Sequence, residues 1–264
     1  MAFDYISKNL AIVPASEAQV PLSNIAFSYG YGAYENTRVT NGEVRYLDEH
    51  LDRLNESCAY LEINPVFTRE QIQTACIDLN SKYTEQTYNM KIILIGGKNQ
   101  ELFILPLAPK FIDRKMYRVG VSVISTEYER YLPQAKSLNM LGSYMVYAKA
   151  NKVGAYDALL VNRDGEILEG SRTNLYALKD SVIYTAPDTE VLAGVTRKHI
   201  IDFAEAKGFE ISYTAPKITE LDKYDGFFIS NTSSKLLPVS KIDDRQFEIS
   251  DKLKELASEF RKQY

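Results

Sequence analysis

The spacing of apolar residues in the first third of the chain predicts two amphipathic helices. The first carries an apolar stripe at intervals of three and four residues, formed by Leu47, Leu51, Leu54, Cys58 and Leu61. Asp48 lies where it could cap that helix. Thr68 and Gln71 have the spacing of a capping box at the start of the second helix. The buried side of the second helix is predicted to hold Ile72, Cys76 and Leu79.

Short apolar runs between polar turns predict strands in the same third of the chain. These runs cover residues 11–13, 33–40, 43–46, 91–95 and 102–107. Asn41-Gly42 is a strong signal for a two-residue hairpin turn, and GGKNQE joins the last two runs as a second hairpin. We therefore expect an α+β unit with an antiparallel sheet.

A proline-containing stretch, PLAPKFIDR at residues 106–114, interrupts this pattern and is the candidate linker. The length of 264 residues permits one large domain or two modest ones. We expect a small α+β domain over residues 1–109, an interdomain linker over 110–116 and a larger domain over 117–264.

The larger domain is predicted to contain more strands than helices. Strands are expected at residues 119–125, 158–161, 167–168, 174–178, 182–185, 210–213, 227–230 and 236–239. Helices are expected at residues 139–152, 196–207, a short one from 219, and a last one that Ser250 caps. The helices do not alternate strictly with strands, and neither GxGxxG nor GxxxxGK[ST] is present. The fold class is therefore α/β, with a mixed or barrel-like sheet rather than a Rossmann fold.

Composition and charge exclude several kinds of binding partner. The net charge of −4, with no run of basic residues, argues against nucleic acid. No stretch of about eighteen apolar residues predicts a membrane span, and the N-terminus lacks a signal-peptide pattern. Cys58 and Cys76 lie at apolar helical positions, where buried free thiols fit a reducing, cytoplasmic compartment. With two histidines and two cysteines, no metal site is expected.

Two residues suggest chemistry on amines. Lys136, just before a predicted helix, could form a Schiff base with an aldehyde if its ammonium group is partly buried; a solvated surface lysine is the alternative. Glu169, in ILEGS at the end of an apolar strand, could be the carboxylate partner of a pyridinium nitrogen or a plain strand-edge acid.

Three further elements could bind a phosphate. The helix start at Val195 and Thr196, which follow Gly194, offers free backbone N–H groups. The turn containing Thr232 and Ser233 supplies hydroxyls and amides. Arg53 lies off the apolar stripe of its helix, either as a surface partner of Glu49 or as a fixed guanidinium. Together with Lys136 and Glu169, these residues would suit pyridoxal phosphate.

The chain resembles the fold-type IV pyridoxal-phosphate enzymes, the class IV aminotransferases that include D-amino-acid and branched-chain aminotransferases and aminodeoxychorismate lyase. The resemblance covers nearly the whole chain through six motifs in order: FSYGYGAYENTRVTNGEV, YLDEHLDRL, AKSLNML, YDALLVNRDGEILEGSRTNLY, LAGVTRKHI and FFISNTSSKLLPV. It implies a small α+β domain and a larger pseudo-barrel domain with pyridoxal 5'-phosphate between them, in a homodimer that completes each site.

The resemblance also implies residue roles. Lys136 would hold the cofactor covalently and later move the proton, and Glu169 would contact the pyridine nitrogen. The phosphate would be held by Arg53, the backbone of Val195, Thr196 and Thr232. Ser233 would face the substrate carboxylate, and Tyr34 would lie beside the cofactor. Of the two histidines, His50 is interpreted as structural and His199 as exposed.

The resemblance leaves the substrate open. SLNML after Lys136, with Leu141 where branched-chain enzymes usually carry tyrosine, favours the D-amino-acid branch, as does Tyr34. GGKNQE nevertheless lacks the arginine and histidine that D-amino-acid enzymes place in that loop. Arg38, Lys98 and Arg172 are candidate replacements for binding the substrate.

The expected activity is therefore transamination between an amino acid, D-amino acids first, and a 2-oxo acid such as 2-oxoglutarate or pyruvate. A branched-chain L-amino-acid aminotransferase is the first alternative. A 4-amino-4-deoxychorismate lyase is the second, and a non-enzymatic cofactor-binding protein is a third.

Overall fold

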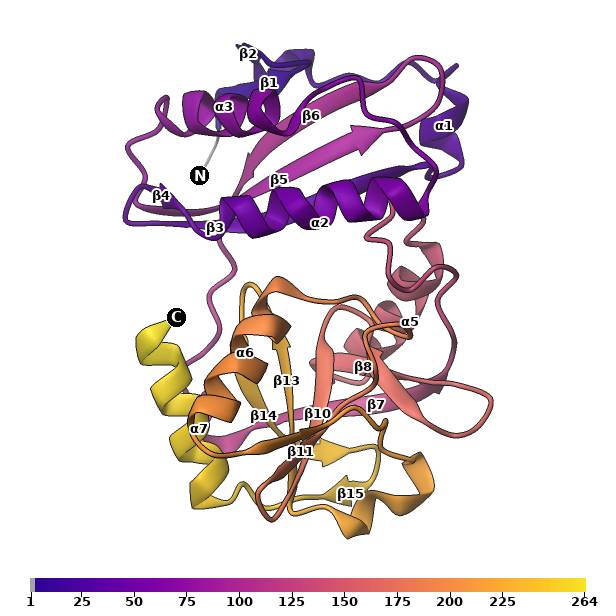
Figure 1. Ribbon diagram of the computed structural model, residues 1–264, viewed down its shortest axis with the longest axis vertical. Coiled ribbons are helices and arrows are strands. Elements are labelled where there is room, and N and C mark those ends of the chain that lie inside the picture. The colour runs from indigo at the N-terminus through magenta and orange to yellow at the C-terminus, as the bar shows by residue number, and fades with distance from the viewer. Residues whose placement is uncertain (1–2) are drawn as a thin grey trace. The chain divides into compact units, whose positions relative to one another are not determined.

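A computed structural model describes residues 3–264 and divides the chain into two compact units (Figure 1). The first unit holds the residues up to Lys110 together with Ala135–Met140. The second holds Phe111–Gln134 and Leu141–Tyr264. The short segment 135–140, which contains Lys136, thus returns to the first unit, and the predicted linear order of domains did not include this return.

The first unit is built on a six-stranded sheet in the order β2-β1-β6-β5-β3-β4, in which every pair is antiparallel. Its strands are β1 (Tyr5–Lys8), β2 (Ala11–Pro14), β3 (Gly32–Thr40), β4 (Glu43–Val44), β5 (Thr87–Ile95) and β6 (Glu101–Leu107). Both predicted hairpins are present. The sequence analysis missed β1, whose four residues are too short for a clear alternation.

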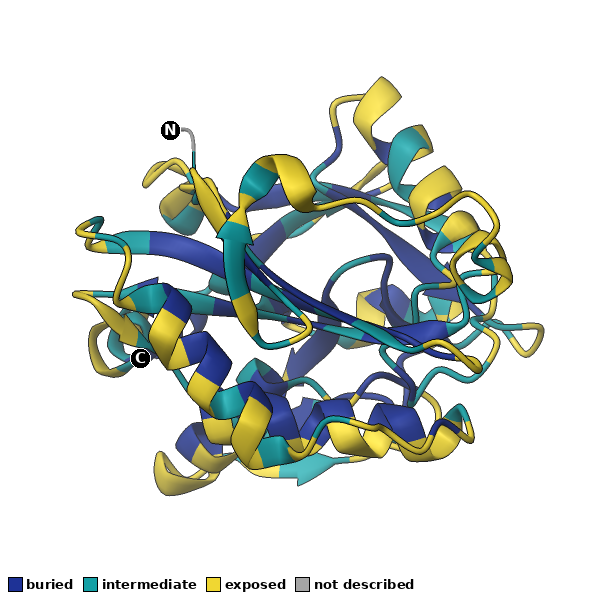
Figure 2. Cartoon of the chain, turned by 90° about the horizontal axis from the view of Figure 1, so that it is seen from above, coloured by how far each residue is buried: buried dark blue, intermediate teal, exposed yellow. Residues whose placement is uncertain are grey.

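Two helices, α2 (Leu47–Tyr60) and α3 (Arg69–Asn80), bury their apolar stripes against one face of this sheet. Figure 2 shows the stripes as buried residues along helices whose other side is exposed. The capping box of Thr68 and Gln71 is confirmed. Asp48 is not the cap of α2: the helix begins at Leu47, after Tyr46 in the left-handed region (φ 53°). Short elements η1 (Ala15–Glu17) and α1 (Ile25–Ser28) complete the unit.

The second unit contains a nine-stranded mixed sheet that closes on itself. Its path runs β12-β11-β10-β13-β14-β7-β8-β9, and a further pairing between β9 and β10 closes the ring. The strands are β7 (Val121–Glu127), β8 (Asp157–Val161), β9 (Ile167–Gly170), β10 (Asn174–Lys179), β11 (Val182–Tyr184), β12 (Glu210–Ser212), β13 (Gly226–Asn231), β14 (Lys235–Ile242) and β15 (Arg245–Gln246). The predicted barrel-like sheet is therefore present.

Alternate residues along these strands face two different cores, as the two-residue period of a strand requires. Leu175, Phe227 and Ile229 pack inside the ring, whereas Tyr176 and Phe228 pack outside it. The outer core lies against α6 (Val195–Ala206) and α7 (Asp251–Gln263), and Leu253, Leu256 and Phe260 of α7 are buried there.

The remaining helices of the second unit are α4 (Met116–Val119), α5 (Leu141–Lys152) and η2 (Ile218–Lys223). Several predicted boundaries differ from those of the structure, and two of the differences have a clear cause. Val119 ends α4, because Gly120 has a φ of 75° and the strand starts only at Val121. Helix α5 begins at Leu141 rather than at Asn139, because the preceding residues pair with β3 of the first unit. Within residues 3–264, no helix is long and apolar enough to cross a membrane.

Candidate active site

The segment that carries Lys136 is extended and paired with the start of β3. Tyr34 N–H donates to the carbonyl of Lys136 (2.9 Å), and Leu138 N–H donates to the carbonyl of Gly32 (2.8 Å). The pairing is possible because β4 covers only Val39 and Thr40, which leaves the edge of β3 open near Gly32. The backbone of Lys136 is thus held in place, and its side chain is half-buried.

The aromatic ring of Tyr34 lies beneath two ammonium groups. The Nζ of Lys136 is 4.6 Å and that of Lys91 is 5.0 Å from its centroid, within the range of a cation–π contact. Tyr34 and Lys91 lie on the sheet face opposite α2, because side chains alternate along β3 and β5. The sequence analysis missed Lys91, although a lone lysine in the apolar run MKIILI is a signal that it faces a polar site.

Of the three cations proposed for the substrate, only Arg38 lies on this face. Its Nη1 donates to Asn89 Oδ1 (2.9 Å) and its Nη2 to the carbonyl of Lys110 (3.4 Å). Lys98 is exposed in the hairpin between β5 and β6. In the second unit, Arg172 stacks on Tyr147 (3.5 Å) and donates to the carbonyl of Tyr156, so it is bound within its own unit.

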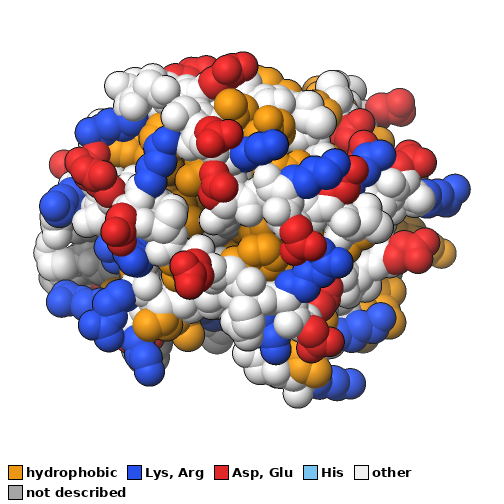
Figure 3. Space-filling view, turned by 90° about the horizontal axis from the view of Figure 1, so that it is seen from below, with side chains coloured by type: hydrophobic (Ala, Val, Ile, Leu, Met, Phe, Trp, Pro, Cys, Tyr) orange, Lys and Arg blue, Asp and Glu red, His pale blue; other side chains and the backbone are white. Residues whose placement is uncertain are grey.

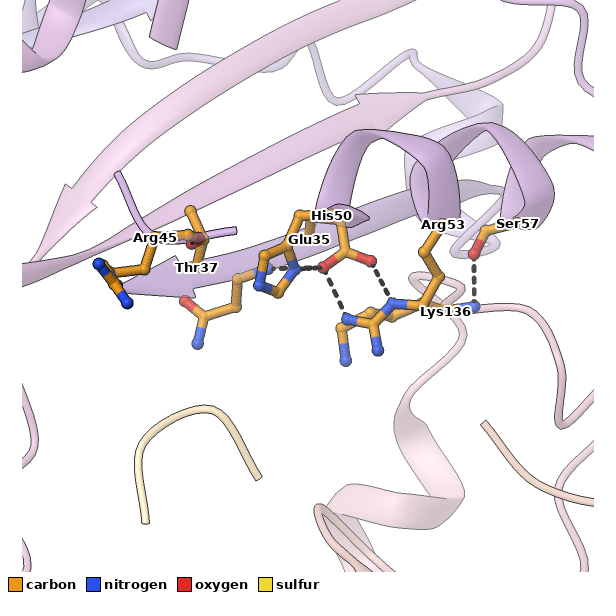
Figure 4. Close-up of polar contacts among 8 residues, drawn as sticks. Glu35, Thr37, Arg45, His50, Arg53, Ser57 and Lys136 are labelled. Atoms are coloured by element: carbon orange, nitrogen blue, oxygen red, sulfur yellow. Dashed lines mark hydrogen bonds and ion pairs between the residues drawn. The ribbon is translucent and has the colours of Figure 1, made fainter. Parts of the chain in front are cut away.

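Arg53 is a buried residue rather than the surface residue that one interpretation of the sequence expected. Its guanidinium nitrogens Nε and Nη2 both donate to the carboxylate of Glu35, at 2.7 and 2.8 Å (Figure 4). The same carboxylate accepts from His50 Nδ1 at 2.7 Å. All three side chains are buried. The sequence analysis did not single out Glu35, although it stands at a buried position of the alternating strand β3.

The protonation of this cluster follows from its charges. Burial alone would raise the pKa of Glu35, but the charge of Arg53 and the hydrogen bonds from His50 and Arg53 outweigh burial and hold the pKa well below 4.5. Burial, together with the charges of Arg53 and Lys136, lowers the pKa of His50 below 6.5. A neutral His50 with its proton on Nδ1 can donate to Glu35, which fits the structural role predicted for it.

In the second unit, Glu169 lies at the pairing that closes the barrel, opposite Asn174. It is 3% exposed. Its Oε1 lies 3.1 Å from Arg130 Nε, and its Oε2 accepts from the backbone N–H of Leu192 (3.4 Å). The sequence analysis missed Arg130, the ion-pair partner of this carboxylate, because it lies far upstream in an irregular segment.

Asp157 shapes the turn that follows Glu169. This fully buried carboxylate accepts hydrogen bonds from the hydroxyls of Ser171 and Thr173 and from the N–H groups of Ala158 and Arg172. The motif LEGSRTN is therefore held as a rigid turn. Residues so distant in the sequence share one carboxylate because β8 and β9 are neighbours in the sheet.

Helix α6 begins without a side-chain cap, at Gly194. Val195 and Thr196 open the helix, so their N–H groups lack intrahelical partners and suit an anion. A Cβ atom at Gly194 would lie 2.5 Å from Asn174 Oδ1, so a larger residue would require the Asn174 side chain to shift. Arg197 is buried behind this end, with Asp188, Thr185 and the carbonyl of Ala186 as partners.

Thr232 and Ser233 lie in the tight turn between β13 and β14. Asn231 Oδ1 accepts from the N–H groups of Ser233 (2.9 Å) and Ser234 (2.8 Å), which fixes the turn. Both predicted residues, Thr232 and Ser233, are half-exposed. Asn231 was part of the quoted motif, but its role as the organiser of the turn depends on geometry that the sequence does not show.

Other predicted features are also placed by the structure. No group of three or more histidine, cysteine or acidic residues suited to a metal exists among residues 3–264. His199 is half-buried rather than exposed, with its ring 5.0 Å from that of Tyr264, because α7 packs over α6.

Acidic and basic side chains are interspersed over the face drawn in Figure 3, in line with the small net charge.

Comparison with known proteins identifies the family of the chain. The family model described as amino-transferase class IV matches residues 32–242. A D-alanine aminotransferase of Bacillus licheniformis is 30% identical over 248 residues, which cover 89% of this chain and 87% of the relative. A putative branched-chain-amino-acid aminotransferase of Methanocaldococcus jannaschii is 29% identical, with 96% and 95% covered.

The fold has equally clear counterparts. A branched-chain amino acid aminotransferase of Escherichia coli superposes with a TM-score of 0.89 at 24% identity and covers 98% of this chain and 94% of its own. The chain belongs to the class IV aminotransferase family. It has the fold-type IV architecture and is a transaminase dependent on pyridoxal phosphate.

The residues present fit that cofactor. An amine suits its aldehyde, a buried carboxylate suits its ring nitrogen, and a buried guanidinium and an uncapped helix start suit its phosphate. These groups are Lys136, Glu169, Arg53 and the first residues of α6.

Proposed function

We propose that this aminotransferase moves an amino group between an amino acid, D-amino acids first, and a 2-oxo acid such as 2-oxoglutarate or pyruvate. The observation that carries the proposal is the position of Tyr34 under the amine of Lys136, in a chain whose D-alanine aminotransferase relative is 30% identical. Position 141 carries leucine where branched-chain enzymes usually carry tyrosine, which also favours D-amino acids as substrates.

In this proposal, Arg53, Thr196, Thr232 and the backbone of Val195 hold the cofactor phosphate, and Glu169 binds the ring nitrogen. Glu169 is supported in this role by its burial and by its ion pair with Arg130. When bound, pyridoxal phosphate supplies an electron sink for the bonds around the substrate Cα. Lys136 Nζ would remove the Cα proton of the substrate as a base and would later return a proton as an acid.

The substrate carboxylate is assigned to Arg38 and Ser233. Arg38 is preferred over Lys98 and Arg172 because it lies on the same sheet face as Tyr34, over whose ring the Nζ of Lys136 lies, whereas Lys98 is exposed in a loop and Arg172 belongs to the second unit. Lys91 adds a second positive charge to this face.

The test is a half-reaction in which purified, cofactor-loaded enzyme is mixed with one amine at a time: D-alanine, D-glutamate, L-leucine or L-glutamate. The proposal expects the visible absorbance of the bound cofactor to bleach with the D-amino acids. Bleaching by L-leucine or L-glutamate alone would replace it with the branched-chain alternative, which the relative from Methanocaldococcus jannaschii favours. A band that persists with all four amines would point to the lyase.

We further propose a cytoplasmic homodimer. The two cysteines are free, which fits a reducing compartment. The segment around α1 exposes an apolar group of residues: Leu22, Ile25, Phe27 and Tyr29. Exposed apolar groups of this kind mark protein interfaces, and a second copy of the chain is the partner expected here. Sedimentation equilibrium should give twice the chain mass of 30.0 kDa, and Leu22→Asp should lower it towards the monomer.

A further inference from the structure

Ser57 is a polar residue at a fully buried position of α2, where a core residue would ordinarily be apolar. Its hydroxyl oxygen accepts a hydrogen bond from the backbone N–H of Lys136 at 3.0 Å (Figure 4). The two residues are 79 positions apart in the sequence. The contact therefore ties the segment 135–140 to the helix, in addition to its pairing with β3.

Ser57 also lies four residues after Arg53, so the two side chains are neighbours on one side of α2, about 5–6 Å apart at Cβ. Arg53 is fixed by Glu35, and Ser57 reaches the backbone of Lys136. One rigid helix thus supports both the guanidinium assigned to the phosphate and the amine assigned to the aldehyde.

We propose that Ser57 is a positioning residue for Lys136, and that through it α2 fixes the lysine relative to Arg53. This inference rests on the proposed role of Lys136. Covalent capture of an aldehyde would form a C=N double bond to Lys136 Nζ, and the two protons of the neutral amine would leave with the aldehyde oxygen as water. Such a bond is favoured when the amine is held close to its target, because the orientation is then prepared before the bond forms.

Loss of the hydroxyl leaves the Lys136 N–H without its acceptor and frees one end of the segment. The pairing of Tyr34 N–H with the Lys136 carbonyl remains, so the segment should loosen without leaving the unit. The affinity for the phosphate should be unchanged, because Arg53 keeps its contacts with Glu35.

The experiment compares two ligands on Ser57→Ala. Pyridoxal phosphate can be captured by the lysine, whereas pyridoxine phosphate carries an alcohol in place of the aldehyde and cannot. We expect Ser57→Ala to raise the Kd of pyridoxal phosphate about tenfold, the effect of one lost hydrogen bond, and to leave that of pyridoxine phosphate within about twofold. Hydrogen exchange at the Lys136 amide should speed up about tenfold or more.

Cys58→Ala is the matched control, because Cys58 is the adjacent buried residue of α2 and packs in the apolar core. It should change neither ligand preference nor exchange at Lys136. Ser57→Thr keeps the hydroxyl and should restore capture. Equal weakening of both ligands by Ser57→Ala, or an unchanged Lys136 amide, would overturn the inference. Failure of the wild-type enzyme to bind pyridoxal phosphate would instead overturn the proposed function.

Discussion

Glu35 holds Arg53 through two hydrogen bonds of 2.7 and 2.8 Å, with all three interacting side chains, His50 included, shielded from solvent. A bidentate carboxylate fixes the plane of a guanidinium as well as its position. Arg53 is therefore oriented by the fold before any ligand arrives, as a guanidinium that binds a phosphate needs to be.

Replacing Glu35 with Gln should destabilise the protein by about 3–5 kcal/mol, because it leaves the charge of Arg53 buried without its counter-ion. Urea unfolding followed by circular dichroism measures this change. Glu43→Gln is the control, since Glu43 is exposed and its ion pair with Arg45 is 3.8 Å long. The control should lower the free energy of unfolding by less than about 1 kcal/mol. Equal losses for the two variants would show that the buried Glu35 cluster does not stabilise the fold more than an exposed ion pair does.

The same cluster predicts that the free energy of unfolding depends on pH. The pKa of Glu35 is lower in the folded state than its ordinary value of 4.5, so its contribution is complete above that pH and is lost as the pH falls. The difference in unfolding free energy between wild type and Glu35→Gln should therefore shrink as the pH decreases from about 4.5 towards about 3. A difference that stays constant from neutral pH into this acidic range would contradict the assignment of a charged Glu35.

Asp157 should be essential to the turn after Glu169. Asp157→Ala leaves two hydroxyls and two N–H groups in a buried site without their hydrogen-bond acceptor. Each unsatisfied group costs about 1–3 kcal/mol. We expect a loss of more than about 2 kcal/mol in urea unfolding. Asp164→Ala, in the exposed turn before β9, should stay within about 0.5 kcal/mol. A mild Asp157→Ala phenotype would mean that the turn is held by other contacts.

The substrate assignment is tested by steady-state kinetics. Arg38→Gln should raise the KM for the amino donor about 10- to 100-fold, the range expected from the loss of a charged hydrogen-bonding group worth about 1.5–3 kcal/mol. Lys98→Gln should leave the KM unchanged, because Lys98 is exposed in its hairpin. The reverse ranking of the two variants would assign the carboxylate to Lys98 in place of Arg38.

The two thiols should be unreactive in the folded protein. Burial raises the pKa of Cys58 to about 11 and that of Cys76 to about 12, so little thiolate is present near pH ~8. Ellman's reagent should modify both thiols at least about tenfold faster in urea than in buffer. Rapid modification of either one under native conditions would show that its helix opens readily.

Much of this molecule could be predicted from local patterns. The stripe of α2, the capping box of α3 and the hairpins all follow from periodicity and turn residues close together in the sequence. The motifs also singled out Lys136 and Glu169 as candidate site residues. Local signals could place these residues on elements, but not show which side chains meet them.

The supporting residues could not be found in this way because their partners are distant in the sequence. Glu35 meets Arg53 across a strand and a helix, Ser57 meets Lys136 after 79 residues, and Arg130 meets Glu169 from an irregular segment. Glu35 and Ser57 are polar residues at buried positions, a choice that only their tertiary partners explain.

The central claim is that Lys136 binds the cofactor covalently, and the most direct measurement is peptide mapping after borohydride reduction of the loaded enzyme. Reduction should fix the pyridoxyl group to one lysine, and trypsin should then fail to cut at that residue. The account predicts a modified peptide running from Tyr131 to Lys149 with Lys136 uncut, absent in Lys136→Ala. A label on another lysine, or no label on a yellow and active enzyme, would contradict it.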